Sequence, residues 1–250
     1  MPVWAIADLH LSFGVPNKEM DIFGPQWASH ARKIEHNWKS HIHAEDLVLI
    51  PGDISWAMNP EEAKADLEWI HNLPGTKVML RGNHDYWWTS LSKVEKVLPS
   101  SIHLIQNNAF RWNDIGIGGT RLWDTSEYNF REFVDFQDNP RARKLHEQEG
   151  SLEETERIFA RELLRLESSL KAIDKSCSTK IVMTHYPPID AFLHDSRTSA
   201  LLEKYKVDIC VFGHLHNLKQ GVKMFGTKNG IRYLLTACDY LNFEPVQVTS

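Results

Sequence analysis

Side chains that can bind a metal ion occur in five short blocks of this sequence. Each block comes directly after a short apolar run of the kind that forms a buried strand. Histidine, aspartate and asparagine are poor material for a hydrophobic core, so their repeated placement after such runs indicates a site. The blocks are Asp8-Leu9-His10, Gly52-Asp53, Gly82-Asn83-His84-Asp85, His185 and Gly213-His214-Leu215-His216.

These residue types suit two divalent transition-metal ions. Imidazole nitrogens bind such ions well, carboxylates add negative charge, and an amide carbonyl can complete the set. Asp8 and His10 are two residues apart, so in an extended segment they share one face. Asp53 stands alone at the end of its apolar run. Because a carboxylate has two oxygens and can bridge ions roughly 3.5–4 Å apart, we expect Asp53 to be the bridging ligand.

The segments between the blocks predict strands and helices that bring the blocks together. Gly82 permits a sharp turn after its strand. In open α/β sheets, ligands gather at the carboxyl ends of the strands, so we expect the five blocks to meet in one crevice. The sequence predicts strands at 3–7, 47–50, 77–80, 101–105, 115–119, 180–183, 207–212 and 233–236, helices at 26–43, 59–73 and 151–173, and antiparallel hairpins in the tail.

In order along the chain, the five blocks resemble the signature of the calcineurin-like metallophosphoesterases, over residues 8–216. The resemblance implies an α/β fold, namely a four-layer α/β/β/α sandwich with mixed sheets. It also implies that His84 is the catalytic histidine, which lies near the phosphoryl group and not on a metal. The implied ligands are Asp8, His10, Asp53 and His216 for one metal, and Asp53, Asn83, His185 and His214 for the other.

The sequence departs from part of this family shortly after Asp53. The protein Ser/Thr phosphatases of the family have an aspartate and an arginine there, which serve the catalytic histidine and the phosphate, whereas this chain has Trp56 and Ala57. Another group must therefore orient His84. Asp85 is the nearest candidate by sequence, and we expect it to take part in catalysis.

Substrate phosphate must be held by the metals and by an arginine from elsewhere. Arg121, which follows Gly118-Gly119-Thr120, is the preferred candidate and Arg81 the second one. Arginine suits this task because its planar guanidinium donates two parallel hydrogen bonds to phosphate oxygens. We expect Asn83 to contribute to substrate binding as well as to the metal.

Together, the residues and the resemblance predict a metal-dependent phosphoric ester hydrolase. We expect two Mn, Fe or Zn ions to activate a bridging hydroxide for in-line attack on a small phosphomonoester or phosphodiester. A nuclease of the same superfamily and a non-catalytic metal-binding scaffold remain as alternatives. The formal charge of −5 and the lack of a basic stripe weigh against the nuclease, and the complete set of ligands weighs against the scaffold.

The composition fits a soluble globular protein. The 250 residues are 42% hydrophobic and 24% charged, and the lack of repeats or linkers favours one domain over residues 1–250. No signal peptide or membrane span is evident, so we expect a cytoplasmic protein; the oligomeric state stays open. Cys177, Cys210 and Cys238 are widely spaced, which predicts reduced, structural thiols.

Residues 121–150 alternate between polar and aromatic types without a regular period. We interpret this segment as an insertion that lies over the site, with a plain surface excursion as the alternative. The aromatic residues near the blocks have two readings as well, a stacking platform for a base or ring and a part of the core, and the core is favoured. They are Trp56, Tyr86, Trp87, Trp88, Trp123 and Tyr186.

Overall fold

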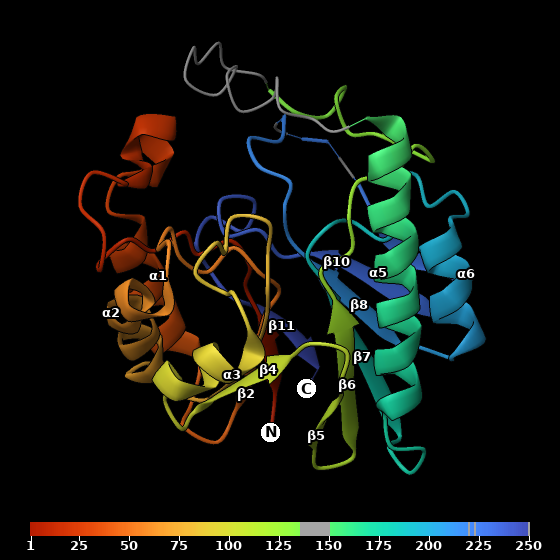
Figure 1. The fold of residues 1–250 in the computed structure, drawn as a ribbon, viewed down its shortest axis with the longest axis horizontal. Helices are drawn as coiled ribbons and strands as arrows, with labels where there is room; N and C mark the ends of the chain where they lie inside the picture. Colours follow the sequence, from red (N-terminus) through yellow and green to blue (C-terminus); the bar gives the residue numbers. More distant parts are fainter. Residues whose placement is uncertain (136–150, 220, 223, 250) are drawn as a thin grey trace.

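The computed structural model describes residues 1–135, 151–219, 221–222 and 224–249. Two β-sheets pack face to face in the middle of the molecule, and helices cover the outer face of each sheet (Figure 1). Both sheets contain parallel and antiparallel pairs. These layers confirm the predicted four-layer α/β/β/α sandwich with mixed sheets. Within the described ranges, none of the helices combines the length and apolar character needed to span a bilayer.

The first sheet has its strands in the order β11-β1-β2-β3-β4. Strands β1 to β4 are parallel, and β11 runs antiparallel to β1. Because they are parallel, β1, β2 and β3 end at the same edge, just before the blocks of Asp8, Asp53 and Asn83. The strands are β1 (Val3–Ala5), β2 (Leu47–Ile50), β3 (Thr76–Leu80), β4 (Ile102–Ile105) and β11 (Val246–Thr249).

The second sheet has its strands in the order β5-β6-β7-β8-β10-β9. The four inner strands are parallel, and the edge strands β5 and β9 run antiparallel to their neighbours. Strands β7 and β8 end directly before the blocks of His185 and His214. The strands are β5 (Phe110–Trp112), β6 (Ile115–Thr120), β7 (Thr179–Thr184), β8 (Ile209–Phe212), β9 (Gly226–Lys228) and β10 (Ile231–Leu235).

The apolar runs form strands that are buried on both faces. In β2, Leu47 and Leu49 point into the layer between the two sheets, whereas Val48 and Ile50 point toward the helices of the first half. This division follows from the alternation of side chains along a strand. Since each fully buried aliphatic side chain contributes roughly 1.5–3 kcal/mol, a continuous apolar run is favoured at such a position.

Polar side chains cap the first turns of α2, α5 and α6. Asn59 accepts a hydrogen bond from the Glu62 N–H (3.1 Å), with Pro60 in the first turn of α2, so this helix begins close to the predicted residue 59. The expected helix at 26–43 starts later, because a 3₁₀ turn precedes it. The helices are η1 (Met20–Phe23), η2 (Pro25–Trp27), α1 (His30–His41), α2 (Pro60–His71), α3 (Leu91–Val94), η3 (Glu95–Val97), α5 (Leu152–Ala172) and α6 (Arg197–Lys204).

The C-terminal part of the chain differs from the predicted tail of antiparallel hairpins. Strands β9 and β10 do form a hairpin around Gly230, but β10 also pairs in parallel with β8, and β11 crosses to the first sheet. Of the expected insertion at 121–150, residues 136–150 lie outside the described residues. In the described part, Val134 forms a bridge with Leu218. The three cysteines are unpaired and buried, as expected: Cys177, Cys210 and Cys238.

A buried carboxylate in α2 ties two of the ligand-bearing loops to the sandwich. Asp66 accepts hydrogen bonds from the hydroxyl of Ser55, two residues after Asp53, and from the backbone N–H of Phe13 (2.7 Å). Phe13 follows the block of Asp8. Burial raises the pKa of Asp66 to about 6, although these hydrogen bonds oppose the rise.

This raised pKa predicts a pH-dependent stability. The folded chain holds a proton on Asp66 at pH values where the unfolded chain has lost it, so the free energy of unfolding falls as pH rises from about 4 to about 6. We expect Asp66→Asn, which mimics the protonated carboxyl, to remove the contribution of Asp66 to this fall. One pKa unit corresponds to about 1.4 kcal/mol. The difference in free energy of unfolding between the two proteins should therefore change by up to about 3 kcal/mol over this pH range. Urea unfolding at pH 4 and pH 6.5 measures it, and parallel pH curves would contradict it.

Candidate metal centre

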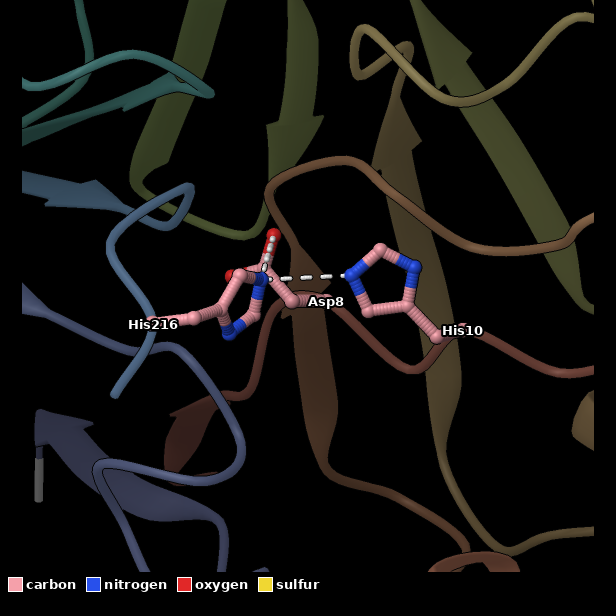
Figure 2. Close-up of side chains that lie close together, drawn as sticks. All are labelled: Asp8, His10 and His216. Carbon is pink, nitrogen blue, oxygen red and sulfur yellow. Dashed lines mark hydrogen bonds and ion pairs between the residues drawn. The ribbon is translucent and has the colours of Figure 1, made fainter. Parts of the chain in front are cut away.

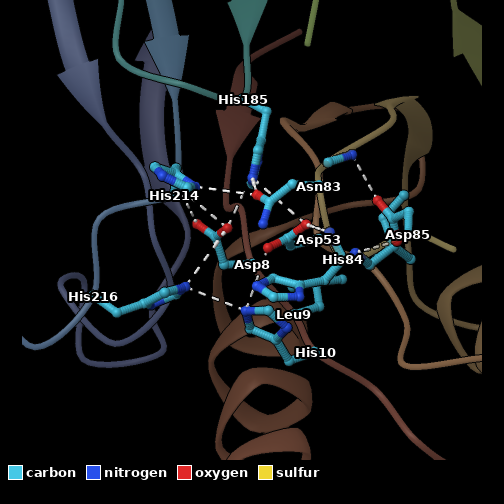
Figure 3. A network of polar contacts seen from close by, with 12 residues as sticks. Asp8, Leu9, His10, Asp53, Asn83, His84, Asp85, His185, His214 and His216 are labelled. Carbon is cyan, nitrogen blue, oxygen red and sulfur yellow. Dashed lines mark hydrogen bonds and ion pairs between the residues drawn. The ribbon is translucent and has the colours of Figure 1, made fainter. Parts of the chain in front are cut away.

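The five sequence blocks converge at one point between the two sheets (Figure 3). Three blocks come from the first sheet and two from the second. Since the strands before them are parallel within each sheet, their carboxyl ends bring the blocks to a common edge. Each predicted metal ligand lies within 4 Å of another one: Asp8, His10, Asp53, Asn83, His185, His214 and His216.

One part of the centre, the first group, consists of Asp8, His10 and His216 (Figure 2). The Nε2 atoms of His10 and His216 are 3.2 Å apart, and His216 Nε2 is 3.8 Å from Asp8 Oδ1. The ligand atoms of the three residues lie within 4.8 Å of one another. One carboxylate oxygen and two imidazole nitrogens at this spacing can hold a single transition-metal ion.

The other part, the second group, consists of Asn83, His185 and His214. The side-chain oxygen of Asn83 lies 2.6 Å from His185 Nε2 and 3.1 Å from His214 Nδ1. His185 Nδ1 donates to the carbonyl of Pro51 at 3.0 Å, so the lone pair of this ring is on Nε2. The lone pair of His185 Nε2 thus faces the side-chain oxygen of Asn83, and two such acceptors can both bind a cation placed between them.

Asp53 lies between the two groups. Its Oδ2 is 3.8 Å from His10 Nε2, and its Oδ1 is 3.5 Å from His185 Nε2. Each oxygen thus faces one group, which supports the predicted bridging role. Asp8 is close to both groups as well, because its Oδ1 lies 3.8 Å from His185 Nδ1. Asp8, Asp53 and His185 form a second set of ligand atoms within 4.8 Å.

The backbone of four predicted ligands adopts the left-handed conformation that non-glycine residues rarely use. The φ angles are 60° at Asp8, 44° at His10, 52° at Asp53 and 74° at His214. Such a conformation costs about 1–3 kcal/mol per residue and persists where the surrounding structure enforces it. The surrounding structure therefore holds four of these residues in a costly backbone conformation at the centre.

Glycines in three of the blocks let the ligand loops approach one another. A Cβ at Gly52 would lie 2.6 Å from His185 Nδ1, and the φ of +94° at this position also favours glycine. A Cβ at Gly82 would overlap the side chain and backbone nitrogen of Asp53. One at Gly213 would overlap the carboxylate of Asp8. The glycines therefore leave space for the side chains of His185, Asp53 and Asp8.

Burial is the main influence on the pKa values of five of the predicted ligands. It raises the pKa of Asp8 well above its usual value and also raises that of Asp53. It lowers the pKa of His185 to about 3, and those of His10 and His214 well below their usual range. Neutral imidazoles offer nitrogen lone pairs, and two buried carboxylates need a positive charge beside them to be ionised at low cost. The donor set therefore fits divalent metal ions.

The sequence analysis did not identify Asp239, which binds the predicted ligand His216 on the side of its ring away from the centre. Its Oδ1 accepts a hydrogen bond from His216 Nδ1 at 2.8 Å. Burial lowers the pKa of His216, but the charges of Asp239 and Asp8 outweigh this and raise it to about 9. Asp239 comes four residues after β10, so the pattern of an acid shortly after an apolar strand was the available signal.

Asp85 has contacts that differ from the expected role beside His84. Its carboxylate is fully buried, and none of its hydrogen bonds in the described chain goes to His84. Asp85 instead joins the loop of Asp53 to the loop of Asn83, and we assign it to positioning these loops. Its hydrogen-bond donors are the backbone N–H groups of Ile54 (2.9 Å), Ser55 (3.2 Å) and Gly82 (2.7 Å) and the indole N–H of Trp87 (2.9 Å).

His84 packs among aromatic rings. The centroid of Trp56 lies 4.8 Å from that of His84 and 5.1 Å from that of His10, on which it stacks. The backbone N–H of His84 donates to Asp53 Oδ1 at 2.8 Å, whereas its Nδ1 is buried and has no hydrogen-bond partner among the described residues. Trp56 therefore packs directly against the His84 ring.

Arg121, the expected phosphate ligand, lies near the centre. Its guanidinium is 4.5 Å from the ring centroid of Trp123. Its positive charge lowers the pKa of Asp53 and of His185, in each case as a smaller effect than burial. Its backbone carbonyl accepts hydrogen bonds from the N–H groups of His185 (3.1 Å) and Tyr186 (3.0 Å).

The aromatic residues near the blocks divide between core and surface. Three of them are buried, in agreement with the favoured reading as core, and Tyr86 is 44% exposed beside His84. Trp56 and Trp123 are partly buried. The buried residues are Trp87, Trp88 and Tyr186.

An α/β/β/α sandwich that gathers carboxylates, imidazoles and an amide between the ends of its strands has the architecture of the metallophosphoesterases. The chain belongs to the calcineurin-like phosphoesterase family, whose model matches residues 1–218. The Gene 66 protein of Mycobacterium phage D29 is 35% identical over 83 residues, which are 33% of this chain and 40% of that protein. The match thus spans about two fifths of the length of that relative.

Two solved structures share the fold. Phosphopantetheinyl hydrolase (PptH) from Mycobacterium tuberculosis has a TM-score of 0.56 at 14% identity, over 99% of this chain and 95% of that one. GAP50, the anchor in the inner membrane complex of Plasmodium, has a TM-score of 0.53 at 12% identity, over 96% of this chain and 72% of that one. At these identities, the similarity establishes the common fold.

The close approach of the loops predicts the effect of one added methyl group. We expect Gly82→Ala to lose bound metal, because its Cβ would displace Asp53 from both groups. Gly116→Ala is the control, since its Cβ would overlap Ile173 in the core, away from the ligands. We expect the control to lower the melting temperature and to retain its metal. Elemental analysis with thermal melts measures both, and full metal content in Gly82→Ala would contradict the argument.

Proposed function

We propose that this chain hydrolyses a phosphomonoester or phosphodiester with two divalent metal ions bound at the candidate centre. The placement of Asp53 carries the proposal, because each of its oxygens faces a different group of ligands at 3.8 and 3.5 Å. The first group with Asp53 would hold one ion, and the second group with Asp53 would hold the other. Mn, Fe and Zn suit this mixture of nitrogen and oxygen ligands, and a small phosphorylated molecule is the proposed substrate.

When bound, two such ions supply positive charge to phosphate oxygens and lower the pKa of water. The protein's own part is to hold the substrate and to move a proton. Arg121 and Asn83 are proposed to hold the phosphoryl group. The positive charge of Arg121 is close enough to lower the pKa of Asp53, and the side-chain amide of Asn83 faces the centre. His84 is proposed to donate a proton to the oxygen of the leaving group. It suits this role because its ring adjoins the centre with Nδ1 unpaired in the described structure.

The proposal is tested by metal content and hydrolysis together. We expect two ions per chain after loading with Mn²⁺ and removal of the excess. The loaded protein should hydrolyse at least one member of a panel of phosphomonoesters, phosphodiesters, cyclic nucleotides and single-stranded DNA, and chelation should abolish that activity. A reproducible content of one ion or none would refute the dinuclear centre. Cleavage confined to DNA would favour a nuclease.

We expect His84→Asn to keep both metals and to slow turnover of alkyl phosphates by roughly 10²–10⁴, the usual range for a lost general acid. The loss should be smaller for p-nitrophenyl phosphate, whose leaving group departs without a proton. His194→Asn, at an exposed histidine outside the centre, is the control and should change neither rate. Equal losses on both substrates would reassign His84 to phosphate stabilisation.

A further inference from the structure

One carboxylate outside the ligand set holds both a ligand ring and the loop that carries it. Oδ1 of Asp239 accepts from His216 Nδ1 at 2.8 Å, and Oδ2 accepts from the backbone N–H of Asn217 at 3.0 Å. The side chain of Asp239 is 8% exposed. Both oxygens are therefore committed to this loop.

The contact fixes which nitrogen of His216 faces the centre. A carboxylate only accepts hydrogen bonds, so Nδ1 must be the donor, and Nε2 is left for the ligand role. This Nε2 is the atom 3.2 Å from His10 Nε2 and 3.8 Å from Asp8 Oδ1. A carboxylate behind a metal-binding histidine orients the ring and raises its basicity.

The segment that carries Asp239 also holds the loop of Asp8. Ala237 forms a parallel bridge with Ala7. The backbone N–H of Cys238 donates to the carbonyl of Ala7 at 3.0 Å, and the thiol of Cys238 lies 2.9 Å from the carbonyl oxygen of Asp8. The segment after β10 therefore positions two members of the first group at once.

The second group has a different kind of support. His185 Nδ1 donates to the backbone carbonyl of Pro51 at 3.0 Å. The acceptor behind His185 is therefore a neutral carbonyl, whereas the acceptor behind His216 is the charged carboxylate of Asp239. Hydrogen bonds to a charged group are shorter and roughly twice as strong as neutral ones. The two metal positions are thus supported unequally.

We propose that Asp239 is a positioning residue that sets the metal affinity of the first group through His216 and leaves that of the second group unchanged. This proposal rests on the proposed function, because it requires two bound ions. It assigns to Asp239 no contact with the substrate and no proton transfer. Its effect reaches the metal only through the orientation and basicity of the His216 ring.

The test uses Asp239→Asn in the full chain, with Mn²⁺ titrated against a competing chelator to obtain two binding constants. We expect one constant to weaken by about 10–100-fold, the usual effect of losing such a partner, and the other to stay the same. Asp46→Asn is the matched control. Asp46 is buried and accepts from the His43 N–H (2.9 Å) away from the centre, and its variant should keep both constants.

A double-mutant cycle separates this role from a general loss of stability. If Asp239 acts through the ring, Asp239→Asn should cause no further loss of affinity in a His216→Ala background. Equal weakening of both constants, or a further tenfold loss in that background, would overturn the proposal. If Asp239→Asn binds two ions as tightly as the parent protein does, the role of Asp239 is refuted and the proposed function is not. A parent protein that binds no metal would refute the proposed function and this role with it.

Discussion

Seven groups that repel one another or compete for the same protons are held together by five loops, and the rest of the structure depends on this constraint. Two buried carboxylates, four imidazoles and an amide oxygen do not assemble on their own, since ionised acids in an apolar setting are costly. The fold enforces the arrangement with parallel strands that end at one edge. Glycines such as Gly82 then leave room for the acids, and strained backbone at residues such as Asp8 aims the side chains.

Three further aspartates organise the loops and do not take the place of ligands. Asp85 joins the loops after β2 and β3, Asp66 fastens the loops after β1 and β2 to α2, and Asp239 holds the loop after β8. Each carboxylate accepts a hydrogen bond from at least one backbone N–H group of a loop. The protein thus uses aspartate residues in two ways. Some are expected metal ligands, and others position the loops that carry the expected ligands.

The sequence predicted most of the strands and the convergence of the five blocks, because both depend on local patterns. A run such as Leu47–Ile50 is apolar at every position and is followed at once by Pro-Gly-Asp. The contacts of Asp85 with the loop of Asp53, and those of Asp239 with the loop of His216, could not be predicted, because these partners lie 22–31 residues away and are brought close by the packing of loops. The same holds for Trp56, whose place against His84 and His10 depends on three separate loops. Strand β11 was missed because a short edge strand has little apolar pattern.

The pairing of β11 with β1 joins the two ends of the described chain, Val246–Thr249 with Val3–Ala5. Contacts between residues so distant in sequence form slowly, because a long loop must close before they gain anything. During synthesis, the loops of Asp8 and Asp53 emerge long before His216, which completes the first group, and before Asp239, which holds the His216 ring. An ion that binds this centre would be captured when folding is nearly finished, and it would stabilise the finished protein without guiding the early steps.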